Sequence, residues 1–374
     1  MLSKFLTATT VALAASLVSA QTFTECDPTK RDCPARKAVG SKIVDVDFRK
    51  GPNKFFTLAD GTSLNYDNNL GAIFSISKDT DAPTISSEEW IFFGQVDVTV
   101  RAARGAGIVT SFVLQSDDLD EIDWEWLGGD NAQVQTNYFS KGCTETYDRG
   151  GFSPVADPIN QFHTYTIRWT PEQLDWIIDG TVVRTLRNTG IEGCSGYPQT
   201  PMQIKLGTWV AGRPGAPQGT IDWAGGLANF DDAPFDGYYQ SLRIQDFMGG
   251  RSEATEYHYG DRSGKWESIE VINDGTEVEP SSSVSSKTRT KTSSATTLST
   301  VTSTTSAASS SSTGESSDAP NITDAPTPSG GGGTNAGITT PPASISTAAA
   351  DRVALNMGNA AALGAAAALG YLVL

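Results

Sequence analysis

Short segments in which apolar and polar residues alternate recur along the chain between residues 94 and 247. A period of two is typical of β-strands with one buried face, and turn residues separate these segments without any long helical period. The clearest hairpin is QLDWIIDGTVVRTL (173–186), in which Asp179 and Gly180 supply a two-residue turn that readily takes positive φ. We therefore predict an all-β fold, an antiparallel β-sandwich. The predicted strands lie in GQVDVTVRAA, GIVTSFVLQS, EIDWEWLG, NAQVQTNYF, HTYTIRWT, LDWIID, TVVRTL, MQIKLGTWV and YQSLRIQDF.

The two ends of the chain differ from this middle part. Residues 1–20 have one early Lys, an apolar run and small residues at the end, which predicts a secretory signal peptide cut after Ala20. Residues 347–374 end in an apolar run that is too short and too rich in Ala and Gly for a spanning helix. We expect a glycosylphosphatidylinositol (GPI) signal rather than a transmembrane helix, with Ser346 as the attachment residue. The protein would then be secreted and held at the cell surface.

Residues 273–346 are dominated by Ser, Thr, Pro and Gly. Such a segment buries too little apolar surface to fold, so we predict a disordered, glycosylated stalk with an N-glycosylation sequon at Asn321. This leaves residues 21–272 as a single folded domain.

Charge and cysteine content limit the classes of function. The formal net charge of −16 argues against a nucleic-acid partner and favours a neutral substrate. The four cysteines of an exported chain predict two disulfides, and of three possible connectivities we favour Cys26–Cys33 with Cys143–Cys194, which has the shortest loop. The N-terminal pair has too few cysteines around it for a small chitin-binding module. With two histidines in the chain and no zinc-like Cys spacing, we expect neither a His-based metal centre nor a zinc site.

Three carboxylates alternate in DEIDWEWLGG (120–129). On a strand, Glu121, Asp123 and Glu125 share one face, while Ile122, Trp124 and Trp126 face the core. Glycoside hydrolysis and transfer need one carboxylate that attacks the anomeric carbon and one acid that protonates the leaving oxygen. Positions four apart lie roughly 13 Å apart along a flat strand, whereas a retaining pair has its carboxyl groups about 5 to 5.5 Å apart. The alternative is a solvated polar face without chemistry.

The segment DEIDWEWLG resembles the catalytic strand of glycoside hydrolase family 16, whose Glu-x-Asp-x-Glu motif lies on a concanavalin-like β-jelly-roll. The similarity extends through VQTNYF and QFHTYTIRWTPEQLDWIIDG and covers most of residues 40–250. With its N-terminal cysteines, stalk and anchor signal, the chain resembles the Crh-type fungal cell-wall transglycosylases.

The resemblance implies that Glu121 is the nucleophile, Asp123 the assisting carboxylate and Glu125 the acid/base. It also implies a chitin donor, a chitin or β-glucan acceptor, cross-linking of the fungal cell wall and no cofactor.

Further substrate contacts are expected on neighbouring segments. In MQIKLGTWV, Lys205 and Trp209 share the face opposite Ile204 and Leu206, where an ammonium and an indole would bind sugar alongside Glu125. Thr220 and Trp223 lie in a Gly- and Pro-rich loop that resembles the family's pattern, and Asn137 follows the acidic strand. The alternative for each is a structural side chain, which is our interpretation of Trp169, Trp176 and His163.

Three functions are consistent with these features. The first is the retaining transglycosylase, acting as a monomer on cell-wall polysaccharides. The second is a secreted hydrolase of β-glucan or chitin with the same fold. The third is a non-catalytic glycan-binding wall protein, which would have no reason to keep both Glu121 and Glu125.

Overall fold

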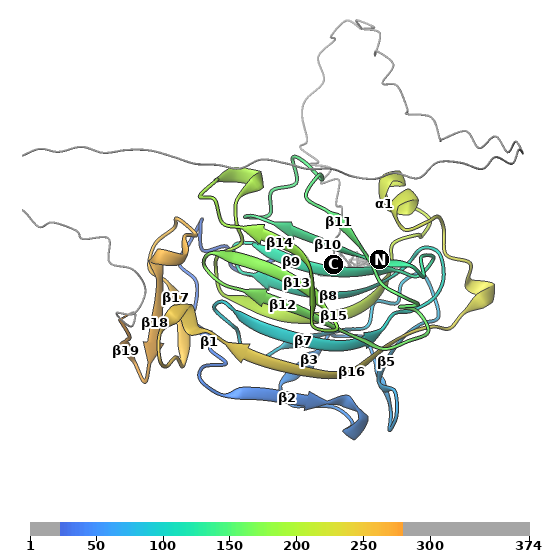
Figure 1. Ribbon diagram of the computed structural model, residues 1–374, viewed down its shortest axis with the longest axis horizontal. Coiled ribbons are helices and arrows are strands. Elements are labelled where there is room, and N and C mark those ends of the chain that lie inside the picture. Colours follow the sequence, from blue (N-terminus) through green and yellow to red (C-terminus); the bar gives the residue numbers. More distant parts are fainter. Residues whose placement is uncertain (1–22, 280–374) are drawn as a thin grey trace, which may run out of the picture. The chain divides into compact units, whose positions relative to one another are not determined.

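The computed structural model describes residues 23–279, which form a two-layered β-sandwich (Figure 1). The predicted signal peptide, Asn321, Ser346 and the anchor signal lie outside the described residues. Within residues 23–279, no helix has the length and apolarity needed to cross a membrane.

One layer is a seven-stranded antiparallel sheet. Its strands, in spatial order, are β11 (Gly151–Pro154), β10 (Gln133–Phe139), β9 (Glu121–Leu127), β8 (Ile108–Ser116), β15 (Met202–Val210), β6 (Thr84–Ser87) and β3 (Phe56–Leu58).

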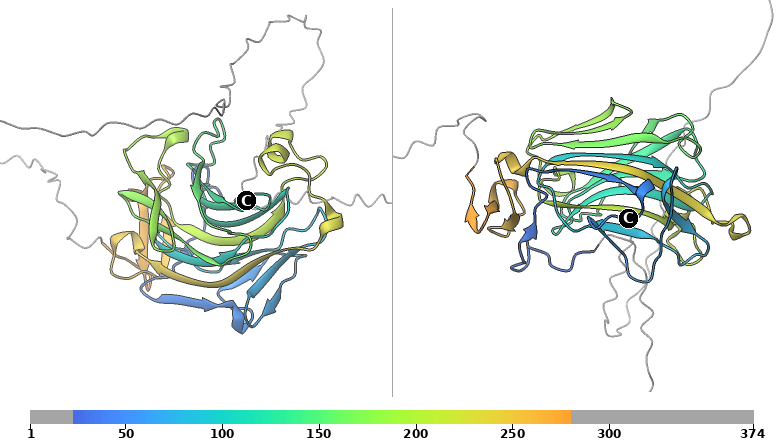
Figure 2. Two further views of the ribbon diagram at one scale, coloured as in Figure 1. Left: turned by 45° about the vertical axis from the view of Figure 1, so that its right-hand side comes forward. Right: turned by 90° about the horizontal axis from the view of Figure 1, so that it is seen from below.

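The second layer is an eight-stranded sheet that includes β2 (Ile43–Asp47), which pairs with β16. The other strands, in spatial order, are β14 (Thr181–Arg187), β13 (Gln173–Ile178), β12 (His163–Trp169), β7 (Gly94–Arg101), β16 (Phe235–Asp246), β5 (Gly71–Ile76) and β4 (Asn65–Asp67). Both sheets curve in the same direction, and the short helix α1 (Gln218–Trp223) lies at the rim of the concave side (Figure 2).

The predicted strands are confirmed to within a few residues, because alternation reflects burial of one strand face against the other sheet. The hairpin β13–β14 turns at Asp179 and Gly180, which both have positive φ (47° and 82°), as a two-residue turn requires. Trp169 and Trp176 are fully buried between the sheets, as predicted.

A small third sheet pairs a strand that precedes the sandwich in the chain with three strands that follow it. Its strands are β1 (Arg36–Lys37), β17 (Glu256–Tyr259), β18 (Ile269–Asn273) and β19 (Thr276–Glu277). The predicted domain end at residue 272 is wrong by a few residues, because β18 continues to Asn273 and β19 pairs with it. The 3₁₀ helices are η1 (Phe48–Lys50), η2 (Gly193–Ser195), η3 (Phe230–Asp232), η4 (Met248–Gly250) and η5 (Trp266–Ser268).

Two disulfides join Cys26 to Cys33 and Cys143 to Cys194, which confirms the predicted connectivity. Disulfides are typical of proteins that fold in an oxidising, extracytosolic compartment. The second bond links the loop after β10 to the loop before β15, and both loops lie next to the start of β9.

Candidate active site

Glu121, Asp123 and Glu125 lie on one face of β9, which we call the active-site face of the seven-stranded sheet. Their side chains are 1%, 0% and 2% exposed, so they are not the solvated polar face of the alternative interpretation. On the opposite face of β9, Trp124 and Trp126 are buried in the core between the sheets.

Two hydrogen bonds join β9 to the eight-stranded sheet. Trp176 Nε1 donates to the backbone carbonyl of Asp123 at 3.0 Å, and Trp124 Nε1 donates to the carbonyl of Thr166 at 3.4 Å. Each indole N–H thus has a partner on the other sheet, as buried donors require. These two hydrogen bonds fix the position of β9 relative to the eight-stranded sheet.

Glu121 is held by Gln115 and Lys205. Gln115 lies directly opposite Glu121 on β8, and its Nε2 donates to Glu121 Oε2 at 2.7 Å. Lys205 Nζ donates to Gln115 Oε1 at 2.5 Å. Because an ammonium only donates, it fixes the Gln115 amide with its oxygen toward Lys205 and its N–H toward Glu121. Burial raises the pKa of Glu121 to about 8, while the Gln115 bond and the Lys205 charge oppose that shift.

Glu125 has a different environment. Its Oε1 has no hydrogen-bond partner among residues 23–279. Burial, together with the negative charge of Glu121, raises the pKa of Glu125 well above its ordinary value. Glu121 accepts a hydrogen bond from Gln115, whereas no described group donates to Glu125 Oε1, so the protonated form is favoured at Glu125.

Asp123 lies between the two glutamates. Its two carboxyl oxygens have no hydrogen-bond donor among the described side chains and backbone groups. Burial and the charges of Glu121 and Glu125 raise the pKa of Asp123 well above its usual range. A protonated Asp123 can donate to Glu121 and so hold that carboxylate without a further positive charge.

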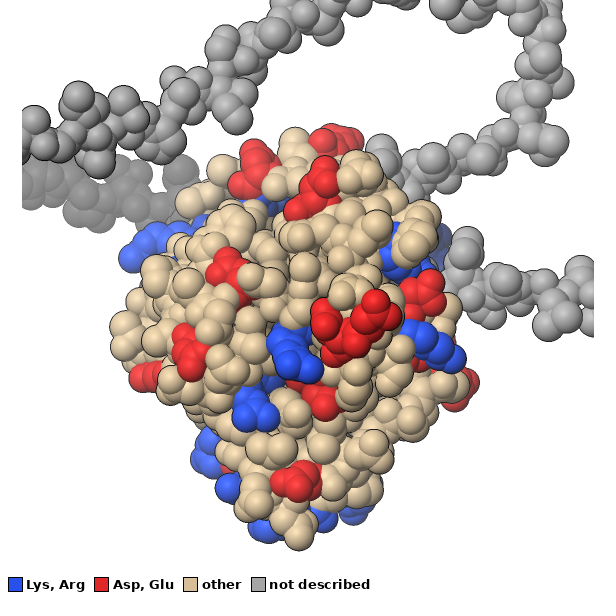
Figure 3. Space-filling view, turned by 90° about the vertical axis from the view of Figure 1, so that its right-hand side faces the viewer, with Lys and Arg blue, Asp and Glu red and all other residues tan. Residues whose placement is uncertain are grey.

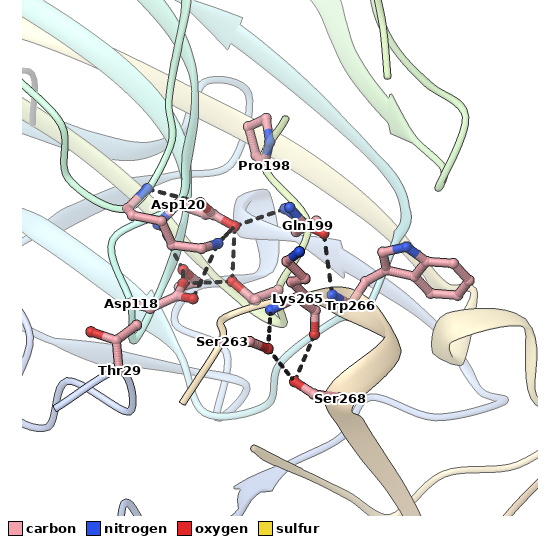
Figure 4. Close-up of polar contacts among 12 residues, drawn as sticks. Thr29, Asp118, Asp120, Pro198, Gln199, Ser263, Lys265, Trp266 and Ser268 are labelled. Carbon is pink, nitrogen blue, oxygen red and sulfur yellow. Dashed lines mark hydrogen bonds and ion pairs between the residues drawn. The ribbon is translucent and has the colours of Figure 1, made fainter. Parts of the chain in front are cut away.

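A buried ionic cluster anchors the turn that leads into β9. Lys141 Nζ lies 2.5 Å from Asp120 Oδ2 and 3.1 Å from Asp118 Oδ2, and both aspartates are buried. Asp120 also accepts from the backbone N of Gln199, and Thr200 Oγ1 donates to Asp118 at 2.6 Å (Figure 4). The turn at Asp120, next to Glu121, is therefore tied to the loops around the second disulfide.

On the other side of Glu125, the loop that follows β15 packs onto the active-site face. Trp223 of α1 stacks on Trp209 with ring centroids 6.2 Å apart. Trp223 Nε1 donates to Gln135 Oε1 at 2.9 Å, and Gln135 lies directly opposite Glu125 on β10. Thr220 of the same helix is buried, and its hydroxyl has no partner within the described part of the chain.

The residues predicted from sequence come together on this face. Lys205 and Trp209 lie on the active-site face of β15, and Asn137 lies opposite Asp123 on β10. Thr220 and Trp223 lie in the loop over that face, which contains a short helix. Sequence reasoning missed Gln115 and Gln135, although the strand alternation that placed Glu121 would also have placed both on one face.

A cavity of about 270 Å³ adjoins Gln115 and Lys205. It lies over β15, β6 and β3, and its lining includes Ser86, Thr57 and Gln203. Half of the fourteen lining side chains present hydroxyl or amide groups, which suit a polyhydroxyl ligand, and five are charged. The charged side chains on the face shown in Figure 3 are of both signs and interspersed, without the continuous basic patch of a nucleic-acid-binding surface.

Comparisons with known proteins identify the family. The profile of the glycosyl hydrolases family 16 matches residues 52–225. Crh-like protein 5 of Aspergillus fumigatus is 45% identical over 265 residues, which are 70% of this chain and 65% of that protein. Crh-like protein 1 of the same organism is 44% identical over 290 residues, which are 76% of this chain and 78% of that protein.

A solved structure of a Crh5 transglycosylase in complex with NAG has 45% sequence identity and a TM-score of 0.63. It covers 66% of this chain and 100% of its own. These matches span the sandwich and the acidic strand at an identity that leaves no doubt about common ancestry. The chain belongs to glycosyl hydrolase family 16 and, within it, to the Crh-like proteins.

Proposed function

We propose that the protein is a retaining transglycosylase that cleaves chitin and transfers the glycosyl chain to a chitin or β-glucan acceptor. The observation that carries the proposal is the difference between the surroundings of Glu121 and Glu125. Glu121 accepts from Gln115 near the Lys205 charge, whereas Glu125 faces the negative charge of Glu121. A nucleophile has to be ionised and a general acid has to be protonated, and these surroundings favour that division.

In the first step, Glu121 attacks the anomeric carbon while Glu125 gives its proton to the leaving glycosidic oxygen. The C–O bond of the donor breaks, a glycosyl ester forms on Glu121, and the Glu125 carboxylate remains. In the second step, Glu125 takes the proton of an acceptor hydroxyl, whose oxygen displaces Glu121. Two displacements at one carbon retain its configuration, and Asp123 holds Glu121 through both.

The substrate class is supported by the comparison and by the chemistry of the face. The Crh5 transglycosylase was solved with NAG, which is N-acetylglucosamine, the repeating unit of chitin. We assign substrate contacts to Lys205, Trp209, Thr220, Trp223, Asn137 and Glu125, whose indole, hydroxyl and amide groups suit sugar rings and their substituents. The protein needs no cofactor in this reaction.

We further propose that the protein is exported and held at the cell wall through a GPI anchor. The disulfides and the predicted signal sequences at both ends support this location.

The test is incubation of the purified protein with chitin oligosaccharides, with and without a fluorescent β-glucan oligosaccharide, followed by mass spectrometry of the products. Longer and hybrid products are expected. Shortened chitin alone would indicate the hydrolase. The absence of any product, together with retained binding, would indicate a non-catalytic glycan-binding protein.

A further inference from the structure

Two glutamines on the active-site face are oriented in the same way. The Gln115 oxygen accepts from Lys205, and the Gln135 oxygen accepts from Trp223 Nε1. An indole N–H only donates, as an ammonium does, so each bond fixes which end of the amide faces away. In both glutamines the NH₂ group is therefore the end that can donate to another partner.

The two amides differ in what their NH₂ groups reach. Gln115 Nε2 donates to Glu121 at 2.7 Å. Gln135 Nε2 is buried and has no acceptor among residues 23–279, although Gln135 lies directly opposite Glu125. A buried N–H without a partner costs about 1–3 kcal/mol, so a fixed, unpaired donor at this place indicates a ligand that completes it.

Other buried polar groups without partners lie on Glu125 itself and on the elements linked to Gln135 through Trp223. Trp209 Nε1, Thr220 Oγ1 and Glu125 Oε1 are also buried and without a partner among the described residues. Trp209 stacks on Trp223, the residue that orients Gln135. Two N–H donors and a hydroxyl on Gln135 and the elements linked to it therefore have no acceptor among the described residues, and a ligand bound there would supply acceptors.

We propose that Gln135 is a specificity-determining residue that donates to the acetamido carbonyl oxygen of the sugar bound beside Glu125. This inference rests on the proposed function. Glu121 and its Gln115–Lys205 support lie toward one end of β9, so the sugar that is attacked lies there. The unpaired donors lie toward Glu125, which protonates the leaving sugar and later activates the acceptor. Gln135 thus contacts the sugar that leaves in the first step and the acceptor sugar that takes its place in the second step.

An acetamido oxygen suits Gln135 better than a hydroxyl does. A carbonyl oxygen only accepts, whereas a hydroxyl can also turn its proton toward Glu125. β-Glucan acceptors carry hydroxyls alone, so the Gln135 bond favours N-acetylated acceptors over β-glucan acceptors at the same site.

The test compares two fluorescent acceptors, a chitin oligosaccharide and a β-1,3-glucan oligosaccharide, with one chitin donor. Because the donor is shared, effects on the first step cancel in the ratio of the two transfer rates. In Gln135→Met, the ratio of chitin to glucan transfer is expected to fall roughly tenfold, the factor for one lost hydrogen bond. Trp223→Phe keeps the stacking but frees the amide to turn, so its ratio falls by less.

The matched control is Gln133→Met, on the same face of the same strand, because the Gln133 amide donates to Asp130 at 2.7 Å. Its ratio is expected to stay unchanged. An unchanged ratio of chitin to glucan transfer in Gln135→Met, including an equal loss with both acceptors, would overturn the proposal. Either result would mean that Gln135 does not distinguish the two acceptors.

A second readout separates this inference from the proposed function. In the Glu121→Gln background, binding of chitin oligosaccharides is compared with binding of their deacetylated forms by calorimetry. If the wild-type protein forms no transfer products, the proposed function fails. The role of Gln135 then stands only if Gln135→Met still reduces the preference for the acetylated ligand.

Discussion

The Gln115→Met substitution tests how the structure opposes protonation of Glu121. It removes the hydrogen bond to Glu121 and preserves the length of the side chain. A hydrogen bond to a charged group contributes about 1.5–3 kcal/mol, which corresponds to roughly 1 to 2 pKa units. The bond lowers the pKa of Glu121, so its loss raises that pKa further, and the nucleophile is ionised only at higher pH.

The assay is the pH dependence of kcat/KM for transfer between chitin oligosaccharides. The acid limb of the profile is expected to move upward by about 1 to 2 pH units, the shift calculated above. Gln203→Met is the control, because Gln203 lies opposite Gln115 on β15 but donates to the Ser87 carbonyl at 2.7 Å. An acid limb that stays in place in Gln115→Met would refute the assignment of Glu121 as the ionised nucleophile that Gln115 supports.

Three other perturbations have definite expected results. Glu125→Gln should lower kcat for chitin oligosaccharides about 10²- to 10⁴-fold, and much less for a donor whose aryl leaving group needs no proton, as measured by steady-state kinetics; equal losses would contradict its role as acid. Trp176→Phe leaves the Asp123 backbone carbonyl without its donor and should lower the free energy of unfolding by about 1–3 kcal/mol, as measured in urea titrations. An unchanged free energy of unfolding would show that this bond does not stabilise the position of β9. Burial raises the pKa of Asp118 to about 6, so the folded state binds more protons than the unfolded state and this group makes the protein less stable as pH rises from about 4 to 6. Asp118→Asn should flatten that slope in unfolding curves, and an unchanged slope would assign it to other groups.

Much of the fold is predictable because strand alternation is a local property of the chain. The same rule placed Glu121, Asp123 and Glu125 on one face and Trp124 and Trp126 on the other, and the structure confirms both. Strands of two residues, such as β1 and β19, are too short to show a period, so the small third sheet and the end of the domain were missed.

The support of the acids depends on long-range strand pairing. Lys205 and Gln115 are 90 residues apart, and Trp223 and Gln135 are 88 apart. Alternation tells which face each side chain occupies, but the order β10-β9-β8-β15 decides which residues are neighbours on that face. The sequence therefore could not predict which side chain bonds to which carboxylate.

By itself, the sequence determined the strand class, the family resemblance and the three acids, because each follows from local spacing or residue type, and it favoured one of three disulfide pairings. Only the tertiary structure decided that the acids are buried and that Glu121, unlike Glu125 Oε1, has a hydrogen-bond donor. The physical reason is that burial and hydrogen-bond partners, which set protonation, are properties of packing between segments distant in the chain. Chemistry at Glu121 thus depends on Lys205 of β15, which lies two strands away from β9 in the seven-stranded sheet, with β8 between them.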